Sequence, residues 1–373
     1  MQLHAPAFRF IKYNIMKLSV CLIVKDEHDV LARCLVGARR FADEIVVVDT
    51  GSSDDTAEIA KKFTDKVYSF GWCDDFSAAR NFSFSKATCD LVMWLDADDV
   101  VEEEDANKIV ALKEKMENYD MAFLLYAAAF DGERPVYTYF RERIFRRSFG
   151  YEWQGAVHEA IAPRGRILYS DATICHRKER QKDKWRNLNI YRNLISSGGK
   201  LTPRDKFYYG RELMFCGLYT EAAAVLEDFL LGDGWSENKS EACLNLATVY
   251  AACGDEEGAE KAAARSFLYG CPKSRACCAL GEKYMKCGNT GAAIFWYKTA
   301  AGITQDLKCG GFGEEDFSGY IPFMQLCVLY DRLGEHSVAE HYNELAGAIK
   351  PHDKSYLHNK EYFKKVNGSR DDK

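Results

Sequence analysis

The sequence predicts an α/β domain with a mostly parallel sheet, followed by an all-α domain of helical repeats. Short apolar runs of strand length alternate with amphipathic segments over the first part of the chain. After about residue 204 the strand-like runs cease, and helix pairs follow one another. The length of 373 residues also suits two domains better than one.

The apolar runs define the predicted strands. Leu18–Val24 and Glu44–Val48 are continuous apolar runs, as expected for strands buried on both faces. Between them, residues 28–40 place apolar side chains at helical spacing. Further strands are predicted at residues 67–70, 90–95 and 121–130. Because strands alternate with helices, we expect a parallel sheet with helices on both faces.

Regularly spaced glycines mark the second part. Gly217, Gly254, Gly288 and Gly334 each follow a helix-like segment, at intervals of 37, 34 and 46 residues. A period near 34 residues resembles the tetratricopeptide repeat, with an insertion in the last unit. An irregular helical bundle is the alternative interpretation.

These patterns give the predicted domain boundaries. The polar segment 169–202 is expected to bridge the domains as a helix, and Met16 is an alternative start. The predicted parts are an N-terminal extension (1–16), the α/β domain (17–180), a helical linker (181–203), the repeats (204–363) and a disordered tail (364–373).

Composition limits the function classes. The net charge of −6 gives no general attraction to nucleic acid or to an anionic membrane. Fourteen cysteines without a C-x-x-C pair indicate reduced thiols, many in apolar helical patterns, and therefore a reducing cytoplasm. The apolar runs are shorter than the ~20 residues of a membrane span.

The strongest chemical signal is the run Trp94-Leu95-Asp96-Ala97-Asp98-Asp99. An apolar strand that ends in carboxylates places them at the carboxyl edge of the sheet, where open α/β folds bind ligands. On an extended backbone Asp96 and Asp98 point the same way, so they can serve one divalent cation, Mn²⁺ or Mg²⁺. Such a cation neutralises charge on a diphosphate leaving group. A simple acidic loop is the alternative.

Three motifs in order resemble the family-two glycosyltransferases of the GT-A fold. They are the run from Val46 to Thr56, the Asp96–Asp98 motif and the opening Cys21–Glu27, in which Asp26 stands where the family usually has Asn. The segment Asp74–Asn81 resembles members with C-terminal tetratricopeptide-like repeats, including bacterial peptide S-glycosyltransferases and lipopolysaccharide-core transferases.

The resemblance implies a nucleotide-sugar site. Asp49 contacts uracil or ribose in this interpretation, or else caps a turn. Arg80 approaches the diphosphate or holds the nucleotide loop, or else forms a surface salt bridge. Trp153 offers its face to a sugar, or else is a core aromatic. The implied nucleotide-sugar-binding residues are Val24, Glu27, Asp49, Ser52, Arg80, Asp96, Ala97 and Trp153.

The run Trp153–Glu159 supplies the second half of the implied site. His158 completes the metal ligands Asp96 and Asp98, or else hydrogen-bonds the diphosphate. Glu159 is the candidate general base, with Asp131 as the alternative.

A basic cluster is a further candidate for binding anions. The cluster consists of Arg141, Arg143, Arg146 and Arg147. One interpretation is that it binds the diphosphate or an anionic acceptor, and the alternative is a charged, exposed strand.

The predicted function is therefore inverting transfer of a single sugar from a nucleotide sugar, a UDP-sugar in the first instance. The acceptor is a hydroxyl or thiol on a peptide, a protein or a cell-surface glycan. The alternative is a protein-interaction scaffold whose repeats do the work, with an inactive glycosyltransferase-like domain. A nucleotidyltransferase would need a Gly- and Arg-rich phosphate loop near the first strand, which the sequence lacks.

Overall fold

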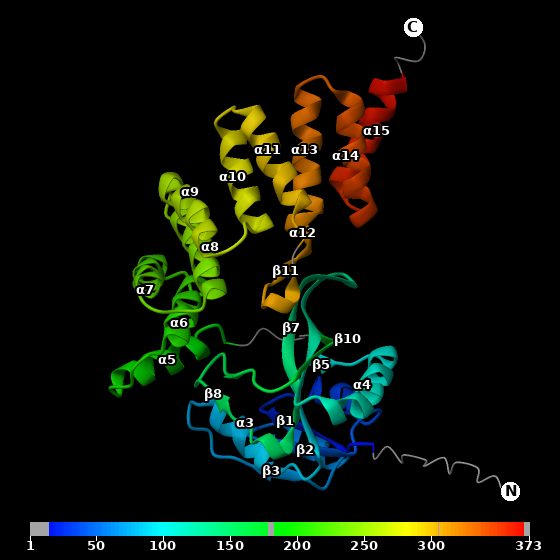
Figure 1. Ribbon diagram of the computed structural model, residues 1–373, viewed down its shortest axis with the longest axis vertical. Helices are drawn as coiled ribbons and strands as arrows, with labels where there is room; N and C mark the ends of the chain where they lie inside the picture. The colour runs from blue at the N-terminus through cyan, green and yellow to red at the C-terminus, as the bar shows by residue number, and fades with distance from the viewer. Residues whose placement is uncertain (1–14, 178–182, 305, 369–373) are drawn as a thin grey trace, which may run out of the picture. The chain divides into compact units, whose positions relative to one another are not determined.

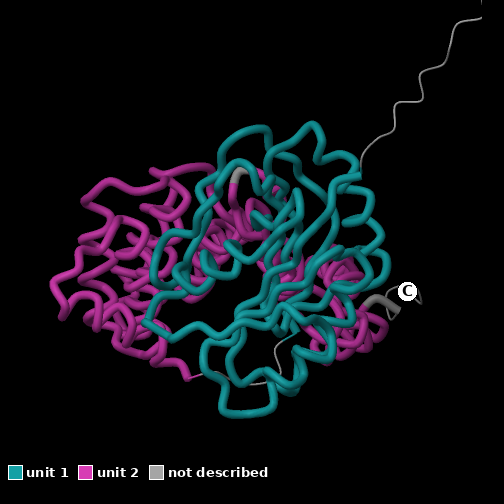
Figure 2. Tube along the Cα trace, turned by 90° about the horizontal axis from the view of Figure 1, so that it is seen from below, with its two compact units in different colours: residues 1–126, 140–180 teal, residues 127–139, 181–373 magenta. Residues whose placement is uncertain are grey.

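The computed structural model describes residues 15–177, 183–304 and 306–368 (Figure 1). Contacts divide the chain into two compact units (Figure 2). The sheet unit comprises Met1–Tyr126 and Phe140–Arg180, and the helical unit comprises Ala127–Tyr139 and Gln181–Lys373. Most of the predicted N-terminal extension lies outside the described residues.

The sheet unit contains the predicted parallel core. The central strand β1 pairs in parallel with β2 and β4, and β2 pairs in parallel with β3. Strands β7 and β5 add antiparallel pairings, with β4 and β10 respectively. The order across the sheet is β3-β2-β1-β4-β7-β6-β10-β5. The strands are β1 (Leu18–Val24), β2 (Glu44–Asp49), β3 (Val67–Ser69), β4 (Leu91–Leu95), β5 (Asp99–Val100), β6 (Met121–Asp131), β7 (Arg134–Arg146), β8 (Trp153–Gln154), β9 (Ala160–Ile161) and β10 (Ile167–His176).

The continuous apolar runs explain this core. Every residue of β4 is buried, and Leu18, Val20 and Leu22 of β1 have no exposed surface. Such strands need cover on both faces, as the sequence predicts. The helices that accompany the sheet are α1 (Leu31–Ala38), α2 (Thr56–Lys61), α3 (Phe76–Ser85) and α4 (Glu103–Lys115).

The predicted bridging helix over residues 169–202 is wrong in its first part. Residues up to His176 belong to β10, and a helix begins only at Arg186. Burial along β10 alternates, with Ser170, Ala172 and Ile174 buried and Asp171 exposed. This alternation is that of a strand, and the last residues of β10 pair with Asp99 and Val100 of β5. The polar composition hid the alternation in the sequence.

The helical unit consists of consecutive helix pairs, which confirms the predicted repeat architecture. The four glycines at the predicted period have φ between 74° and 82°, a conformation in which glycine ends a helix. The elements of this unit are α5 (Arg186–Ser196), α6 (Pro203–Phe215), α7 (Tyr219–Leu231), α8 (Ser236–Ala252), α9 (Glu256–Arg265), α10 (Ser274–Lys286), α11 (Thr290–Gly302), β11 (Gly313–Glu314), α12 (Glu315–Ser318), α13 (Tyr320–Arg332), α14 (His336–Ile349) and α15 (Lys354–Gly368).

The ends of β6 and β7 that meet in a hairpin, residues 127–139, belong to the helical unit. Tyr137 stacks on Phe312 with ring centroids 5.4 Å apart, and β11 pairs with Tyr137 and Thr138. Arg134 forms an ion pair of 2.5 Å with Asp316. Residues 127–139 therefore make these contacts as part of the helical unit. The contiguous domain boundaries derived from the sequence stay predictions, and α15 includes the first residues of the predicted tail.

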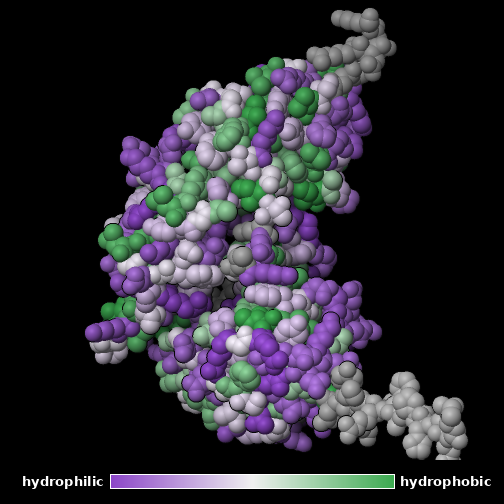
Figure 3. All heavy atoms as spheres, in the orientation of Figure 1, coloured by the Kyte–Doolittle hydropathy of each residue, from purple (hydrophilic) through white to green (hydrophobic). Residues whose placement is uncertain are grey.

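The surface in view mixes hydrophilic and hydrophobic side chains (Figure 3). Among the described residues, no helix is both long enough and apolar enough to cross a membrane.

Candidate active site

Loops after β1, β2 and β4 form the edge where the candidate residues gather. These strands are parallel neighbours, so their carboxyl ends lie along one edge. The Val24 carbonyl accepts hydrogen bonds from the amide and the hydroxyl of Thr50, at 2.9 and 3.1 Å. The Glu27 amide donates to Thr56 Oγ1 at 2.8 Å. The first two loops therefore form one connected structure.

Asp49 and Ser52 shape the second of these loops. Asp49 Oδ1 accepts from the Ser52 amide and hydroxyl at 2.9 and 2.7 Å, and from the Gly51 amide at 3.2 Å. Ser52 Oγ in turn accepts from the Asp26 amide at 3.0 Å. Asp49 thus has the turn-forming role that was its alternative interpretation, and its contact with a nucleoside stays a prediction.

Three non-glycine residues with positive φ lie in loops around the candidate residues: Asp26 (52°), Asp74 (57°) and His158 (51°). This conformation costs free energy and concentrates at functional sites. The Phe76 amide donates to the Ala156 carbonyl at 2.9 Å, so the loop that holds Asp74 is tied to the loop that holds His158.

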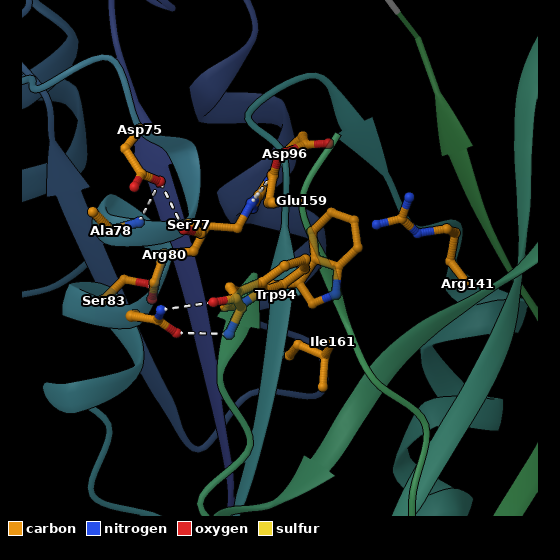
Figure 4. A network of polar contacts seen from close by, with 12 residues as sticks. Asp75, Ser77, Ala78, Arg80, Ser83, Trp94, Asp96, Arg141, Glu159 and Ile161 are labelled. Atoms are coloured by element: carbon orange, nitrogen blue, oxygen red, sulfur yellow. Dashed lines mark hydrogen bonds and ion pairs between the residues drawn. The ribbon is translucent and has the colours of Figure 1, made fainter. Parts of the chain in front are cut away.

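Arg80 is the centre of a buried polar network (Figure 4). Asp75 caps α3 by accepting from the Ala78 amide at 3.0 Å, which fixes the start of the helix that carries Arg80. Arg80 donates from Nε to Glu159 Oε1 at 2.5 Å and from Nη2 to Asp96 Oδ1 at 2.7 Å. Its guanidinium lies over the rings of Trp94 and Trp153, at 4.6 and 4.9 Å from their centroids.

This arrangement makes Arg80 a buried bridge between two carboxylates. The residue is 6% exposed, so it does not form the surface salt bridge of the alternative interpretation. Burial alone would raise the pKa of Asp96, but the charges of Arg80 and Arg143 outweigh it and hold that pKa well below its usual range. Both carboxylate partners reinforce the positive charge of Arg80 and raise its pKa against the effect of burial.

Asn81, the next residue of α3, holds the neighbouring segment. Its amide Nδ2 donates to the Trp153 carbonyl at 3.0 Å, and its Oδ1 accepts from the Trp153 amide at 2.8 Å. Trp153 is 2% exposed and packs edge-on against Trp94, with centroids 5.1 Å apart. This is the environment of a core aromatic, and a sugar contact of Trp153 stays a prediction.

The carboxylates after β4 divide into two groups, because the backbone there is not extended. The Asp99 amide donates to the Asp96 carbonyl at 3.0 Å and closes a turn. The expectation that Asp96 and Asp98 point the same way on an extended backbone is therefore wrong. Asp96 reaches Arg80, whereas Asp98 and Asp99 lie beside His176 at the end of β10.

Asp98, Asp99 and His176 form the better buried of two possible metal-ligand groups in the described part of the chain. His176 Nδ1 lies 3.3 Å from Asp98 Oδ1 and 3.6 Å from Asp99 Oδ1. Burial alone would lower the pKa of His176, but the two carboxylates outweigh it and raise that pKa to about 10. Neither Asp96 nor His158 belongs to this group, and the buried Ala97 follows Asp96 in the turn.

The second group is His28, Asp54 and Asp55, in the loops after β1 and β2. His28 Nδ1 lies 2.8 Å from Asp54 Oδ2, and His28 Nε2 lies 2.6 Å from Asp29 Oδ1. Asp55 is exposed, and Asp54 Oδ1 accepts from the amide of Thr56 at 3.0 Å. These contacts organise the loops around the start of α2.

The basic cluster on β7 divides among separate structural roles. Arg143 is fully buried against Asp99. Arg146 donates to the carbonyls of Met116 and Glu117 after α4, at 2.6 and 2.8 Å. Arg147 donates to the Cys89 carbonyl at 2.6 Å. The cluster is therefore neither one phosphate site nor one exposed strand.

Asp131 lies in the helical unit. Its carboxylate forms an ion pair of 3.0 Å with Lys350, which lowers its pKa. Its role as a base stays a prediction, as does that of Glu159.

Sequence reasoning missed His176; it gave Arg143 only as part of the basic cluster and Asn81 only as the end of a motif. A strand pattern over residues 167–176 would have placed His176 at a sheet edge, and Arg143 stands in alternation with Arg141 on a strand. Asn81 gave no separate signal.

Residues 19–166 match the family model of glycosyl transferase family 2. The match includes Arg80, the turn at residues 96–99 and Glu159, so the sheet unit carries a family 2 glycosyltransferase domain. The predicted mostly parallel sheet followed by helical repeats is confirmed.

The chain is similar to the SPbeta prophage-derived glycosyltransferase SunS of Bacillus subtilis, with 26% identity over 221 residues, which are 55% of this chain and 51% of that protein. It is 43% identical over 90 residues to a TPR repeat-containing protein of Synechococcus elongatus, covering 24% and 22% of the two chains. The chain thus spans about half or less of the length of these relatives. Among solved structures, S. aureus TarS 1–349 in complex with UDP-GlcNAc is similar with a TM-score of 0.36 and 14% identity, over 76% of this chain and 90% of that one.

Proposed function

We propose that this protein is an inverting glycosyltransferase that moves one sugar from a nucleotide sugar, a UDP-sugar, to a hydroxyl or thiol of an acceptor. One observation carries the proposal. Asp98 and Asp99, which lie within the family 2 match of residues 19–166, come together with His176 beyond the carboxyl end of β4. Carboxylates and an imidazole there suit a cation that binds a diphosphate.

The residues present fit such a cation. Asp99 Oδ1 and His176 Nδ1 are buried, and within the described residues neither makes a hydrogen bond. A carboxylate oxygen together with an imidazole nitrogen suits Mn²⁺, and Mg²⁺ less well. We assign the protein ligands to Asp98 and His176, and we assign His158 to the diphosphate, its alternative role in the sequence-based prediction. A cation held here would neutralise the charge that develops on the leaving nucleoside diphosphate.

Glu159 is the proposed general base. Arg80 holds its Oε1, which fixes the direction of the carboxylate next to Asp96. Glu159 takes the proton from the acceptor O–H or S–H, and the acceptor atom forms a bond to the anomeric carbon. The bond from that carbon to the diphosphate oxygen breaks, and its electron pair leaves with the diphosphate. The fixed network favours the reaction through position and electrostatics.

The proposed acceptor is a peptide, a protein or a cell-surface glycan. Helical repeats commonly hold extended peptides, which supports a peptide acceptor by analogy. The cysteine usage of the sequence supports a reducing cytoplasm as the place of the reaction.

The test is donor turnover with a variant of one proposed ligand. The purified chain is incubated with Mn²⁺ and a panel of UDP-, GDP- and CMP-sugars, and nucleotide release and donor binding are followed together. We expect release or binding for one donor, dependent on Mn²⁺ and lost in Asp98→Asn. The matched control is Asp171→Asn, since the Asp171 side chain is 82% exposed. If the wild-type chain binds none of these donors, the proposal fails, and the alternative function of a protein-interaction scaffold is favoured instead.

A further inference from the structure

Arg143 of β7 is a fully buried arginine whose position needs an explanation. Its side chain has no exposed surface, and it is the largest fully buried side chain among the described residues. A guanidinium remains charged in proteins, and removing it from water is costly. Apolar residues of similar volume often stabilise a core as well or better. Stability alone is therefore a weak reason for an arginine here.

The contacts of Arg143 are few and directed at the turn after β4. Nη1 donates to Asp99 Oδ2 at 2.9 Å and to the Trp94 carbonyl at 3.1 Å. The guanidinium carbon lies 3.6 Å from the centroid of the Trp94 ring and 4.6 Å from that of Tyr126. In the described part of the protein, Nε and Nη2 make no hydrogen bond. Two aromatic faces and one carboxylate thus hold the charge.

Asp99 transmits this contact to the turn. The same Oδ2 that binds Arg143 also accepts from the Asp96 amide at 3.0 Å, and the Asp99 amide donates to the Asp96 carbonyl at 3.0 Å. The Asp99 side chain therefore fixes the backbone on which Asp96 and Asp98 stand. Its other oxygen, Oδ1, lies 3.6 Å from His176 Nδ1.

The charge of Arg143 also acts on the whole group. Asp96, Asp98 and Asp99 bring three carboxylates into four consecutive residues, and like charges this close repel one another. Arg143 is a permanent positive charge buried against Asp99. Together with Arg80 it holds the pKa of Asp96 low against the effect of burial.

We propose that Arg143 is a positioning residue of the cation site. By holding Asp99, it fixes the turn at residues 96–99 in the arrangement that directs Asp98 and His176 at one divalent cation. Arg143 touches neither the cation nor the nucleotide sugar. This inference rests on the proposed function, since it concerns the cation that the function needs.

The main test uses a variant that removes both charges of the buried pair, Arg143→Met/Asp99→Asn, in the full chain. Removing both partners avoids leaving one charge buried and unpaired. Mn²⁺ binding is measured by the electron paramagnetic resonance signal of free Mn²⁺, and UDP binding by calorimetry with and without Mn²⁺. We expect Mn²⁺ affinity to fall about 10- to 100-fold, the usual effect of losing a group that orients a ligand. UDP binding without metal is expected to remain unchanged.

Two further variants sharpen the comparison. Arg143→Lys keeps the charge but has a single ammonium in place of the planar fork, and we expect a smaller loss of Mn²⁺ affinity. Arg147→Met removes a neighbouring arginine whose side chain donates to the Cys89 carbonyl, and wild-type Mn²⁺ affinity is expected. Should the double variant fail to fold, Arg143→Lys decides.

The outcomes separate this inference from the proposed function. If the folded double variant binds Mn²⁺ with wild-type affinity, the positioning role is overturned. If the double variant does not fold, wild-type Mn²⁺ affinity in Arg143→Lys overturns it. Equal loss of Mn²⁺ binding and of metal-free UDP binding also overturns it, because a general disturbance of the domain would act on both. If the wild-type chain binds UDP but no Mn²⁺, the cation part of the proposed function fails, and the positioning role fails with it.

Discussion

Replacing Arg80 by methionine should destabilise the sheet unit strongly and in a pH-dependent way. The change leaves Asp96 and Glu159 without the guanidinium that both carboxylates bind, and it removes a cation from between Trp94 and Trp153. Loss of one partner of a buried ion pair costs about 3–5 kcal/mol. The Asp96 side chain is 32% exposed, so solvent screens part of its share and we expect the lower end of that range.

The pH dependence follows from the direction of the Asp96 pKa shift. Its pKa is lowered in the folded protein, so its stabilising contribution is present above the unfolded value of about 3.9 and is lost as the pH falls through the folded value. In Arg80→Met, Asp96 loses the nearest of its counter-charges and becomes easier to protonate. The difference in unfolding free energy between wild type and variant should therefore narrow from pH 7 to pH 4.

Urea unfolding followed by far-UV circular dichroism at several pH values measures this difference. Arg80→Met/Asp96→Asn/Glu159→Gln removes all three charges and should recover about 2 kcal/mol or more of the loss at pH 7. Arg40→Met, at an exposed arginine of the same unit, is the control and should change stability by less than about 0.5 kcal/mol. A loss that is equal at pH 7 and pH 4, with no recovery in the triple variant, would refute the charge argument and leave only packing.

Three further outcomes are expected from unfolding measurements. Asn81→Ala removes both hydrogen bonds to the Trp153 backbone and should cost about 1–3 kcal/mol, whereas no loss would show that water replaces them. Thr202→Ala removes the capping box of α6 that Thr202 forms with Asp205, and should cost about 1 kcal/mol. Burial raises the pKa of Glu314, which disfavours its charged form, so the stability of Glu314→Gln relative to wild type should rise from pH 4 to pH 7; a fall would contradict that shift.

The elements that the sequence predicts correctly are those with a strong local pattern. Continuous apolar runs define β1, β2 and β4. A glycine with positive φ after each of α6, α8, α10 and α13 reveals the repeats, because glycine adopts that conformation without strain. The strand β10 has no such run. Its burial alternates without a continuous apolar run, and the sheet order that makes it a strand depends on partners far away in the sequence.

The sequence predicts where the candidate site lies, but it does not predict which side chains contact one another there. A strand that ends in carboxylates locates the sheet edge from the sequence alone. The basic side chain that pairs with each carboxylate is set by tertiary contacts. Asp96 pairs with Arg80 of α3, Asp99 with Arg143 of β7, and Asp98 with His176 of β10. None of these pairs follows from spacing in the motif.

The three carboxylates after β4 differ in the chemistry of their basic partners, two of which are arginines and one a histidine. A guanidinium keeps its charge and cannot leave, so Asp96 and Asp99 are bound to permanent partners that fix the backbone between them. Imidazole can give up its proton and become a metal ligand, and a metal ion binds neutral imidazole while releasing that proton. In the proposed function, Asp98 is therefore the carboxylate that exchanges its contact with protonated His176 for a bond to the cation. Within one short turn, contacts with Arg80 and Arg143 thus set Asp96 and Asp99 apart from Asp98, the proposed cation ligand. This separation comes from residues that the Asp96–Asp98 motif does not contain.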